Sequence, residues 1–341
     1  MTLTDLKAKM KSASLAGFYI FAGEEDYLKS YYRNALRKDA GGDDAFEMFN
    51  YTAFDGADVD FGAVREALYS PPMMADYKVV EWRHADLDKL KESEIKALLE
   101  LGEQKTDFPY AIFMITALSD GFETSERKPS KLHTRLKEFY DVIIFEKSSD
   151  NQLLSWLKKH FDAEGIGVDL NTLNALLFRV GHSMEQLDKE VVKLACYAKA
   201  NAKGFVNADD VAEVCATTVE CEAFAISNAI IEKNMEKAFL ALTDMKQQRV
   251  EPTAVLAQLS KTYADLISIS LLMDEGCGAQ TIAETMKFHP YRLSLYMSAA
   301  KKIGTKKLSE ALASLVKTDA ASKMGGIGGY GAIEMFITQN I

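Results

Sequence analysis

Apolar residues follow two alternating patterns along the first 145 residues of the chain. Short uninterrupted apolar runs are typical of strands that are buried on both faces of a sheet. They predict five strands, at residues 17–22, 46–51, 77–82, 110–115 and 142–145. Between them, apolar residues recur at the spacing of amphipathic helices, at residues 24–36, 61–69 and 95–101. This alternation predicts a mostly parallel sheet that is covered by helices.

The strand pattern stops after Lys147, and only helical spacing continues to the end of the chain. Four helices are expected first, at residues 151–161, 171–180, 184–198 and from Asn207 onward. Seven more are expected at residues 223–232, 235–249, 252–274, 279–286, 290–303, 305–321 and 329–339. We therefore expect an α/β fold followed by an all-α part, with three domains over residues 1–146, 147–216 and 217–341.

The composition is that of an ordinary folded protein, with 48% hydrophobic and 26% charged residues among 341. The 40 basic and 50 acidic residues give a net charge of −10, which does not indicate a non-specific nucleic-acid binder. No apolar run is long enough to cross a membrane. The cysteines form no C-x-x-C pair, and Cys196 is expected to be buried on a helix. A cytoplasmic protein without a metal site fits best.

The turn after the first expected strand partly matches a phosphate-binding loop. That loop has the pattern G-x-x-x-x-G-K-[ST], and its backbone N–H groups surround the phosphates. Gly23, Lys29 and Ser30 stand at the required positions, but Leu28 replaces the second glycine. Residues 24–26 are acidic and would repel a triphosphate. We therefore expect a degenerate loop that opens a helix and binds no nucleotide.

The other parts of a catalytic site are also missing from the sequence. No acidic pair follows the third or the fourth expected strand, where a nucleotide hydrolase would hold Mg²⁺. Residues 326–331 match G-x-G-x-x-G but follow a helix, so a loop is expected there. We therefore expect no catalytic residue, no metal and no cofactor. The alternative is a P-loop-type NTPase with an unorthodox loop that uses Lys29 and Ser30.

Short segments along nearly the whole chain carry a resemblance to a known family. Residues 19–28 are similar to its opening strand and Gly-Glu-Glu-x-x-Leu turn, and residues 68–80 to a proline-containing segment before a strand. Residues 187–194 are similar to its Leu-x-x-Glu-x-x-Lys-Leu helix. Further matches lie at residues 224–230 and 254–259 and at Asp319 and Lys323. In their order and spacing these segments resemble the delta subunit of bacterial DNA polymerase III.

The resemblance implies an AAA+-like first domain, a small helical lid and a C-terminal helical collar. It implies a non-ATPase component of the DNA polymerase III holoenzyme, which binds and opens the sliding clamp for loading onto primed DNA. The implied partners are the beta sliding clamp, the gamma or tau ATPase subunits and delta-prime, with primer-template DNA reached through the complex. Lysines at 301–302 and 306–307 could face DNA, but the neutral charge of residues 217–341, with 13 basic and 13 acidic groups, favours a solvated face.

The resemblance also implies a clamp-binding element at Met73 and Met74, next to Pro72 and Tyr69. In the family, two apolar residues at this place project into a pocket on the clamp. Burying two such side chains could contribute roughly 3–6 kcal/mol. Many relatives carry Leu-Phe or Phe-Phe there, and methionine can fill an irregular pocket. The residues alone leave a second interpretation open, in which both methionines cover the end of the sheet.

Overall fold

The computed structural model describes residues 1–12, 14–40, 47–56, 59–122, 129–324 and 327–341. The described residues form two compact units, Met1–Ser148 and Ser149–Ile341. The boundary between them lies two residues after the expected end of the α/β domain. The second expected boundary, between residues 216 and 217, falls inside the second unit and stays a prediction.

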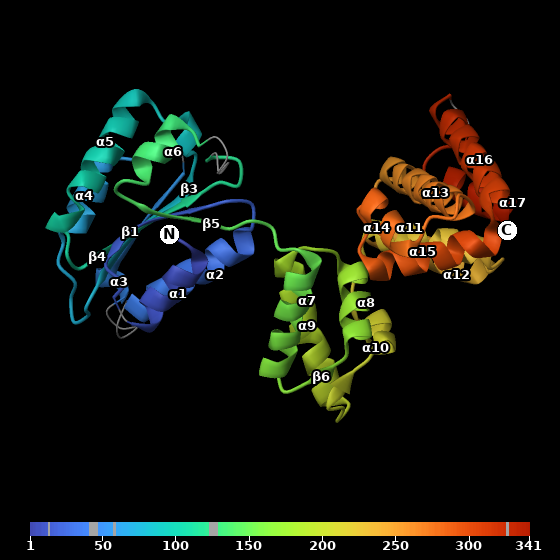
Figure 1. Ribbon diagram of the computed structural model, residues 1–341, viewed down its shortest axis with the longest axis horizontal. Helices are drawn as coiled ribbons and strands as arrows, with labels where there is room; N and C mark the ends of the chain where they lie inside the picture. Colours follow the sequence, from blue (N-terminus) through green and yellow to red (C-terminus); the bar gives the residue numbers. More distant parts are fainter. Residues whose placement is uncertain (13, 41–46, 57–58, 123–128, 325–326) are drawn as a thin grey trace. The chain divides into compact units, whose positions relative to one another are not determined.

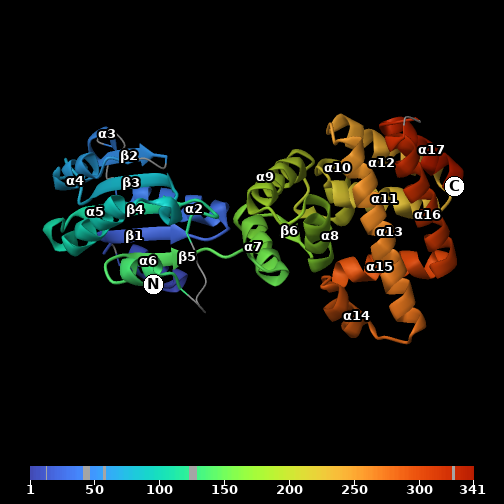
Figure 2. The same ribbon diagram turned by 90° about the horizontal axis from the view of Figure 1, so that it is seen from above.

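A parallel sheet forms the centre of the first unit. Its strands are β1 (Gly17–Ala22), β2 (Tyr51–Asp55), β3 (Lys78–Ala85), β4 (Ala111–Ala117) and β5 (Asp141–Ile144). They lie side by side in the order β2-β3-β4-β1-β5, and every pair is parallel (Figure 2). All amino ends therefore meet at one edge of the sheet and all carboxyl ends at the other.

Helices cover both faces of this sheet (Figure 1). Phe18 and Ile20 of β1 pack on one face with α4 (Phe61–Tyr69), α5 (Glu92–Glu103) and α6 (Lys131–Leu136). Tyr19 and Phe21 pack on the other face with α1 (Leu3–Lys11) and α2 (Asp26–Ala40). Two single-turn helices, η2 (Leu87–Lys89) and η3 (Lys105–Asp107), lie in the connections. The buried strands are thus the continuous apolar runs of the sequence, as predicted.

The second unit is almost entirely helical. Its first helices are α7 (Asp150–Ala163), α8 (Leu170–Val180), α9 (Met184–Ala200) and α10 (Ala208–Val214). They are followed by α11 (Val219–Ile231), α12 (Met235–Gln247), α13 (Pro252–Asp274), α14 (Ala279–Met286), α15 (Pro290–Ile303), α16 (Thr305–Lys323) and α17 (Tyr330–Asn340). Asn207 caps α10 by accepting hydrogen bonds from the amides of Asp209 and Asp210, which confirms the expected helix start.

Two sequence-based predictions of strands are wrong. Glu47–Asn50 forms the short helix α3, and the second strand begins only at Tyr51. Phe46, the first residue of the predicted strand, lies outside the described residues. Strands also continue beyond Lys147, because β6 (Gly167–Val168) pairs with β7 (Phe205–Val206). Two-residue strands are too short to leave a periodic pattern in the sequence.

Two further findings concern the burial of the cysteines and the search for a membrane-spanning helix. Cys196 is exposed, whereas Cys215 is buried, so the expected burial of Cys196 is wrong. In the part of the chain that the structure describes, no single helix has the length and apolar character to span a membrane. Only α10 and α11 taken together, bent by 110° at their break, reach that length and composition.

Candidate functional site

The degenerate loop lies at the carboxyl edge of the sheet, between β1 and α2. Gly23 has a φ of +103°, and a side chain there would collide with the main chain of Phe145. The main-chain amide of Glu25, two residues after Gly23, donates to the Phe145 carbonyl oxygen at 3.0 Å. Gly23 therefore serves a close approach between the loop and the end of β5. One amide of the loop is used inside the protein rather than for a phosphate.

Lys29, the lysine of the phosphate-loop pattern, also has its partners inside the protein. Its side chain is only 2% exposed, and Nζ donates to the carbonyl oxygen of Ala117 at 3.0 Å. Nζ also lies 2.8 Å from Oδ1 of Asp26, whose carboxylate accepts a hydrogen bond from Ser119. The ammonium group is thereby held at the end of β4, where it joins α2 to the sheet.

Leu28, Ser30 and Glu25 of the loop also lie partly or wholly inside the protein. Leu28 is half-buried and packs against the core beneath α2, and Ser30 is half-buried on the same helix. The Glu25 side chain is buried, and this burial raises the pKa of its carboxyl group. A buried carboxylate at this position is unfavourable for an incoming polyphosphate.

The opposite, amino edge of the sheet carries the predicted clamp-binding residues. Met73 and Met74 lie between α4 and β3, and their side chains are 47% and 77% exposed. Tyr69, the last residue of α4, is also exposed, and Pro72 is half-buried. Met74 has a φ of +55°, which is a strained conformation for a residue with a side chain. Both methionines thus face solvent on a turn of defined shape.

Buried polar groups hold this turn from below. Asn50 is fully buried, and its side-chain amide donates to the Met73 carbonyl oxygen at 2.8 Å. Its side-chain oxygen accepts from the Met73 amide at 2.6 Å, so both main-chain groups of Met73 are bound. The Tyr110 hydroxyl donates to the Tyr69 carbonyl oxygen at 3.0 Å. The methionine backbone is therefore fixed although its side chains are free in solvent.

Lys78, the first residue of β3, fixes the same region from a second direction. Its main-chain amide donates to the Tyr110 carbonyl oxygen at 2.9 Å, and Nζ donates to the Phe49 carbonyl oxygen at 2.5 Å. The side chain is buried, and burial lowers the pKa of its ammonium group. Lys78 therefore joins the start of β3 to α3.

Two family models match this chain, one within each unit. "DNA polymerase III, delta subunit" matches residues 19–140, and "DNA polymerase III delta subunit, C-terminal domain" matches residues 220–340. The chain belongs to the delta subunit family of DNA polymerase III. The resemblance predicted from the sequence is thereby confirmed, and both residues 19–28 and residues 68–80 lie within the first match.

Individual members of the delta subunit family are similar to this chain over most of their length. DNA polymerase III subunit delta of Bacillus subtilis (strain 168) is 20% identical over 339 residues, which are 98% of this chain and 96% of that protein. The probable delta subunit of Aquifex aeolicus (strain VF5) is 22% identical over 318 residues, 90% and 86% of the two chains. The solved Bacillus subtilis DNA clamp loader delta protein has a TM-score of 0.58 at 21% identity, and covers 99% and 98%. The chain thus shares the fold of that delta protein, with the parallel sheet described above in its first unit.

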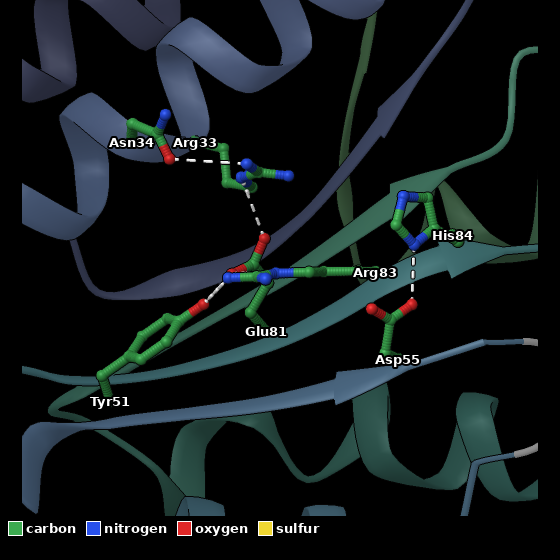
Figure 3. Close-up of polar contacts among 7 residues, drawn as sticks. All are labelled: Arg33, Asn34, Tyr51, Asp55, Glu81, Arg83 and His84. Atoms are coloured by element: carbon green, nitrogen blue, oxygen red, sulfur yellow. Dashed lines mark hydrogen bonds and ion pairs between the residues drawn. The ribbon is translucent and has the colours of Figure 1, made fainter. Parts of the chain in front are cut away.

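A buried ionic network joins α2, the helix that the degenerate loop opens, to the sheet (Figure 3). The Glu81 carboxylate on β3 is 1% exposed and lies 3.1 Å from Nε of Arg33 on α2 and 3.0 Å from Nε of Arg83. It also accepts a hydrogen bond from the Tyr51 hydroxyl. These partners surround the carboxylate, so we assign the network to holding α2, β2 and β3 together.

The sequence-based reasoning missed the residues that support the methionines. The apolar pattern places Asn50 inside a predicted strand, where asparagine is unfavourable. This mismatch is a sequence signal that residues 47–50 do not form a strand. Met48 and Phe49 were assigned to the same strand, whereas the structure exposes both on α3. No group of three or more metal-ligating side chains occurs within the described residues.

Proposed function

We propose that this delta-family chain is the subunit of a replicative clamp loader that binds and opens the sliding clamp. In this proposal Met73 and Met74 insert into an apolar pocket on the clamp, with Tyr69 and Pro72 beside them. The observation that carries the proposal is the pair of exposed methionines on a backbone that buried Asn50 fixes. Family membership and the similarity to the Bacillus subtilis clamp loader delta protein support it.

A fixed, exposed apolar pair suits both the binding and the opening of a clamp. Fully burying each methionine contributes about 1.5–3 kcal/mol, and little of that is lost to ordering a backbone that is already held. A ligand shifts a conformational equilibrium only by its difference in affinity for the two states. Clamp opening therefore requires that the pair bind the open form of the clamp more tightly than the closed form.

The chain is proposed to work without hydrolysing ATP itself. Lys29 is held by Ala117 and Asp26, and the buried Glu25 stands where phosphates would have to lie. In this proposal ATP is hydrolysed by the gamma or tau ATPase subunits. This chain assembles with those subunits and with delta-prime through residues 217–341. Primer-template DNA is reached through the whole cytoplasmic complex.

The proposal is tested by surface plasmon resonance between this chain and the sliding clamp of the same organism. Met73→Ala/Met74→Ala should weaken binding about hundredfold or more, because two buried side chains are truncated. The matched control is Met235→Ala/Met324→Ala, since those methionines of the second unit are 45% and 85% exposed. The control should bind like the wild type. Equal affinity of both double variants would contradict the assignment of Met73 and Met74.

A further inference from the structure

The exposed apolar side chains of the first unit are concentrated at one place. Among its described residues, six large hydrophobic side chains are exposed. Five of these lie in two segments at the amino edge of the sheet: Met48, Phe49, Tyr69, Met73 and Met74. Met48 is 79% exposed and Phe49 48%, so α3 presents two neighbouring apolar side chains to solvent. Clustered exposure of this kind marks an interaction surface.

We infer that α3 is a second part of the clamp-binding surface, in which Met48 and Phe49 contact the clamp beside Met73 and Met74. This inference rests on the proposed function and names additional contact residues for the same partner. Asn50 acts in it as a positioning residue, because it bonds Met73 and contacts no part of the clamp itself. The partner that covers this surface is the sliding clamp, which contacts it through apolar residues.

Hydrogen bonds from two buried side chains, Asn50 and Lys78, join the two segments. Asn50, the last residue of α3, binds both main-chain groups of Met73, at 2.8 and 2.6 Å. The Lys78 ammonium holds the carbonyl oxygen of Phe49 at 2.5 Å. Because Asn50 is fully buried and Lys78 is 6% exposed, water does not easily replace any of these three bonds. A partner that buries Met73 and Met74 therefore meets α3 in a fixed place next to them.

The residue types in α3 suit an apolar partner surface. Methionine and aromatic residues are enriched in the buried centre of protein interfaces, and methionine adapts to irregular pockets. An asparagine side chain is a suitable support, because it carries a donor and an acceptor that match a peptide group. An aspartate at position 50 could still accept from the Met73 amide but could not donate to its carbonyl oxygen.

The contact is tested by clamp binding of Met48→Ala/Phe49→Ala, measured as for Met73→Ala/Met74→Ala and with Met235→Ala/Met324→Ala as the control. We expect an affinity loss of about tenfold or more for the α3 variant. Met48→Glu is the second variant, because a charge at this highly exposed position leaves folding intact and still opposes an apolar partner. Circular dichroism and thermal unfolding check that each variant is folded.

The positioning role is tested with Asn50→Asp and Asn50→Ala. Asn50→Ala removes both bonds to Met73 and should speed hydrogen exchange at the Met73 amide, whereas Asn50→Asp keeps the acceptor for that amide and should speed its exchange less. Both substitutions should weaken clamp binding about tenfold, because each loses the donor to the Met73 carbonyl oxygen. In the Met73→Ala/Met74→Ala background the same substitutions should change binding little, because Asn50 acts through the methionines. An equal loss in both backgrounds would overturn the positioning role.

The outcomes separate this inference from the proposed function. If Met73→Ala/Met74→Ala loses binding while both α3 variants bind like the wild type, the inference is overturned and the proposed function stands. If the wild type does not bind the clamp, both are overturned. Self-association of the free chain that disappears in Met48→Ala/Phe49→Ala would assign the surface to a second copy of this chain and also overturn the inference.

Discussion

At the carboxyl edge of the sheet the Lys29 ammonium is buried against Ala117 and Asp26, whereas at the amino edge Met73 and Met74 extend into solvent. In open α/β sheets, ligands usually bind at the carboxyl ends of the strands. In this chain the polar groups of that edge bind one another. The amino edge instead exposes apolar side chains on a fixed backbone. The loop side chain at one edge of the sheet is thus used inside the protein, while the exposed apolar side chains lie at the opposite edge.

The largest effect on stability is expected for Gly23→Ala at the carboxyl edge. A Cβ atom there meets the Phe145 main chain, and the φ of +103° is strained for alanine. We expect the free energy of unfolding to fall by about 2–5 kcal/mol in urea titrations. Gly56→Ala is the matched control, because its φ is +96° but no atom of the described residues lies within 4 Å of the added Cβ. Equal losses in the two variants would show that the close approach to β5 contributes nothing.

A smaller effect is expected for Lys29→Met, which keeps an apolar side chain of similar length. The variant leaves the Ala117 carbonyl oxygen without its lysine donor, so unfolding should become easier by about 1–3 kcal/mol. ATP with Mg²⁺ should shift the melting temperature of neither the wild type nor the variant. An ATP-induced rise in the wild type that Lys29→Met abolishes would contradict the structural role and support the NTPase alternative.

The smallest effect is a pH dependence at Glu25. Burial raises the pKa of this carboxyl group in the folded state, so its ionised form is less stable there than in the unfolded chain. Glu25 therefore contributes fully to the free energy of unfolding only below its unfolded pKa of about 4.3, and this contribution is lost as the pH rises through the folded pKa. Glu25→Gln should therefore stabilise the fold at pH 7 relative to the wild type, and less so at pH 3. Urea unfolding at both pH values checks this, and a larger gain at pH 3 would contradict it.

The sequence predicted the long elements well and the two edges only partly. The helices over residues 252–274, 279–286 and 290–303 begin and end as predicted, because apolar periodicity and proline at two helix starts act locally. Glu47–Asn50 was predicted as a strand because its apolar residues fit one. In the structure its last residue, Asn50, donates to Met73, 23 residues further on, and no local pattern in the sequence contains such a bond.

The two candidate sites show the same limit. The altered phosphate loop could be recognised from Leu28 and the three acids, but the new partner of Lys29, Ala117, is 88 residues away. Met73 and Met74 were identified through the family resemblance, and their exposure became known only from the structure. The proposed contribution of α3 could not be predicted from the sequence, since it depends on the bonds that the fold allows between Asn50 and Met73.

The most direct test compares clamp binding by Met73→Ala/Met74→Ala and by Lys29→Met, measured side by side at a temperature where both variants are folded. We predict that Met73→Ala/Met74→Ala at the amino edge loses about hundredfold or more in affinity, while Lys29→Met at the carboxyl edge binds like the wild type. Unchanged binding by Met73→Ala/Met74→Ala, or loss of binding by Lys29→Met alone, would contradict the proposal that Met73 and Met74 bind the clamp.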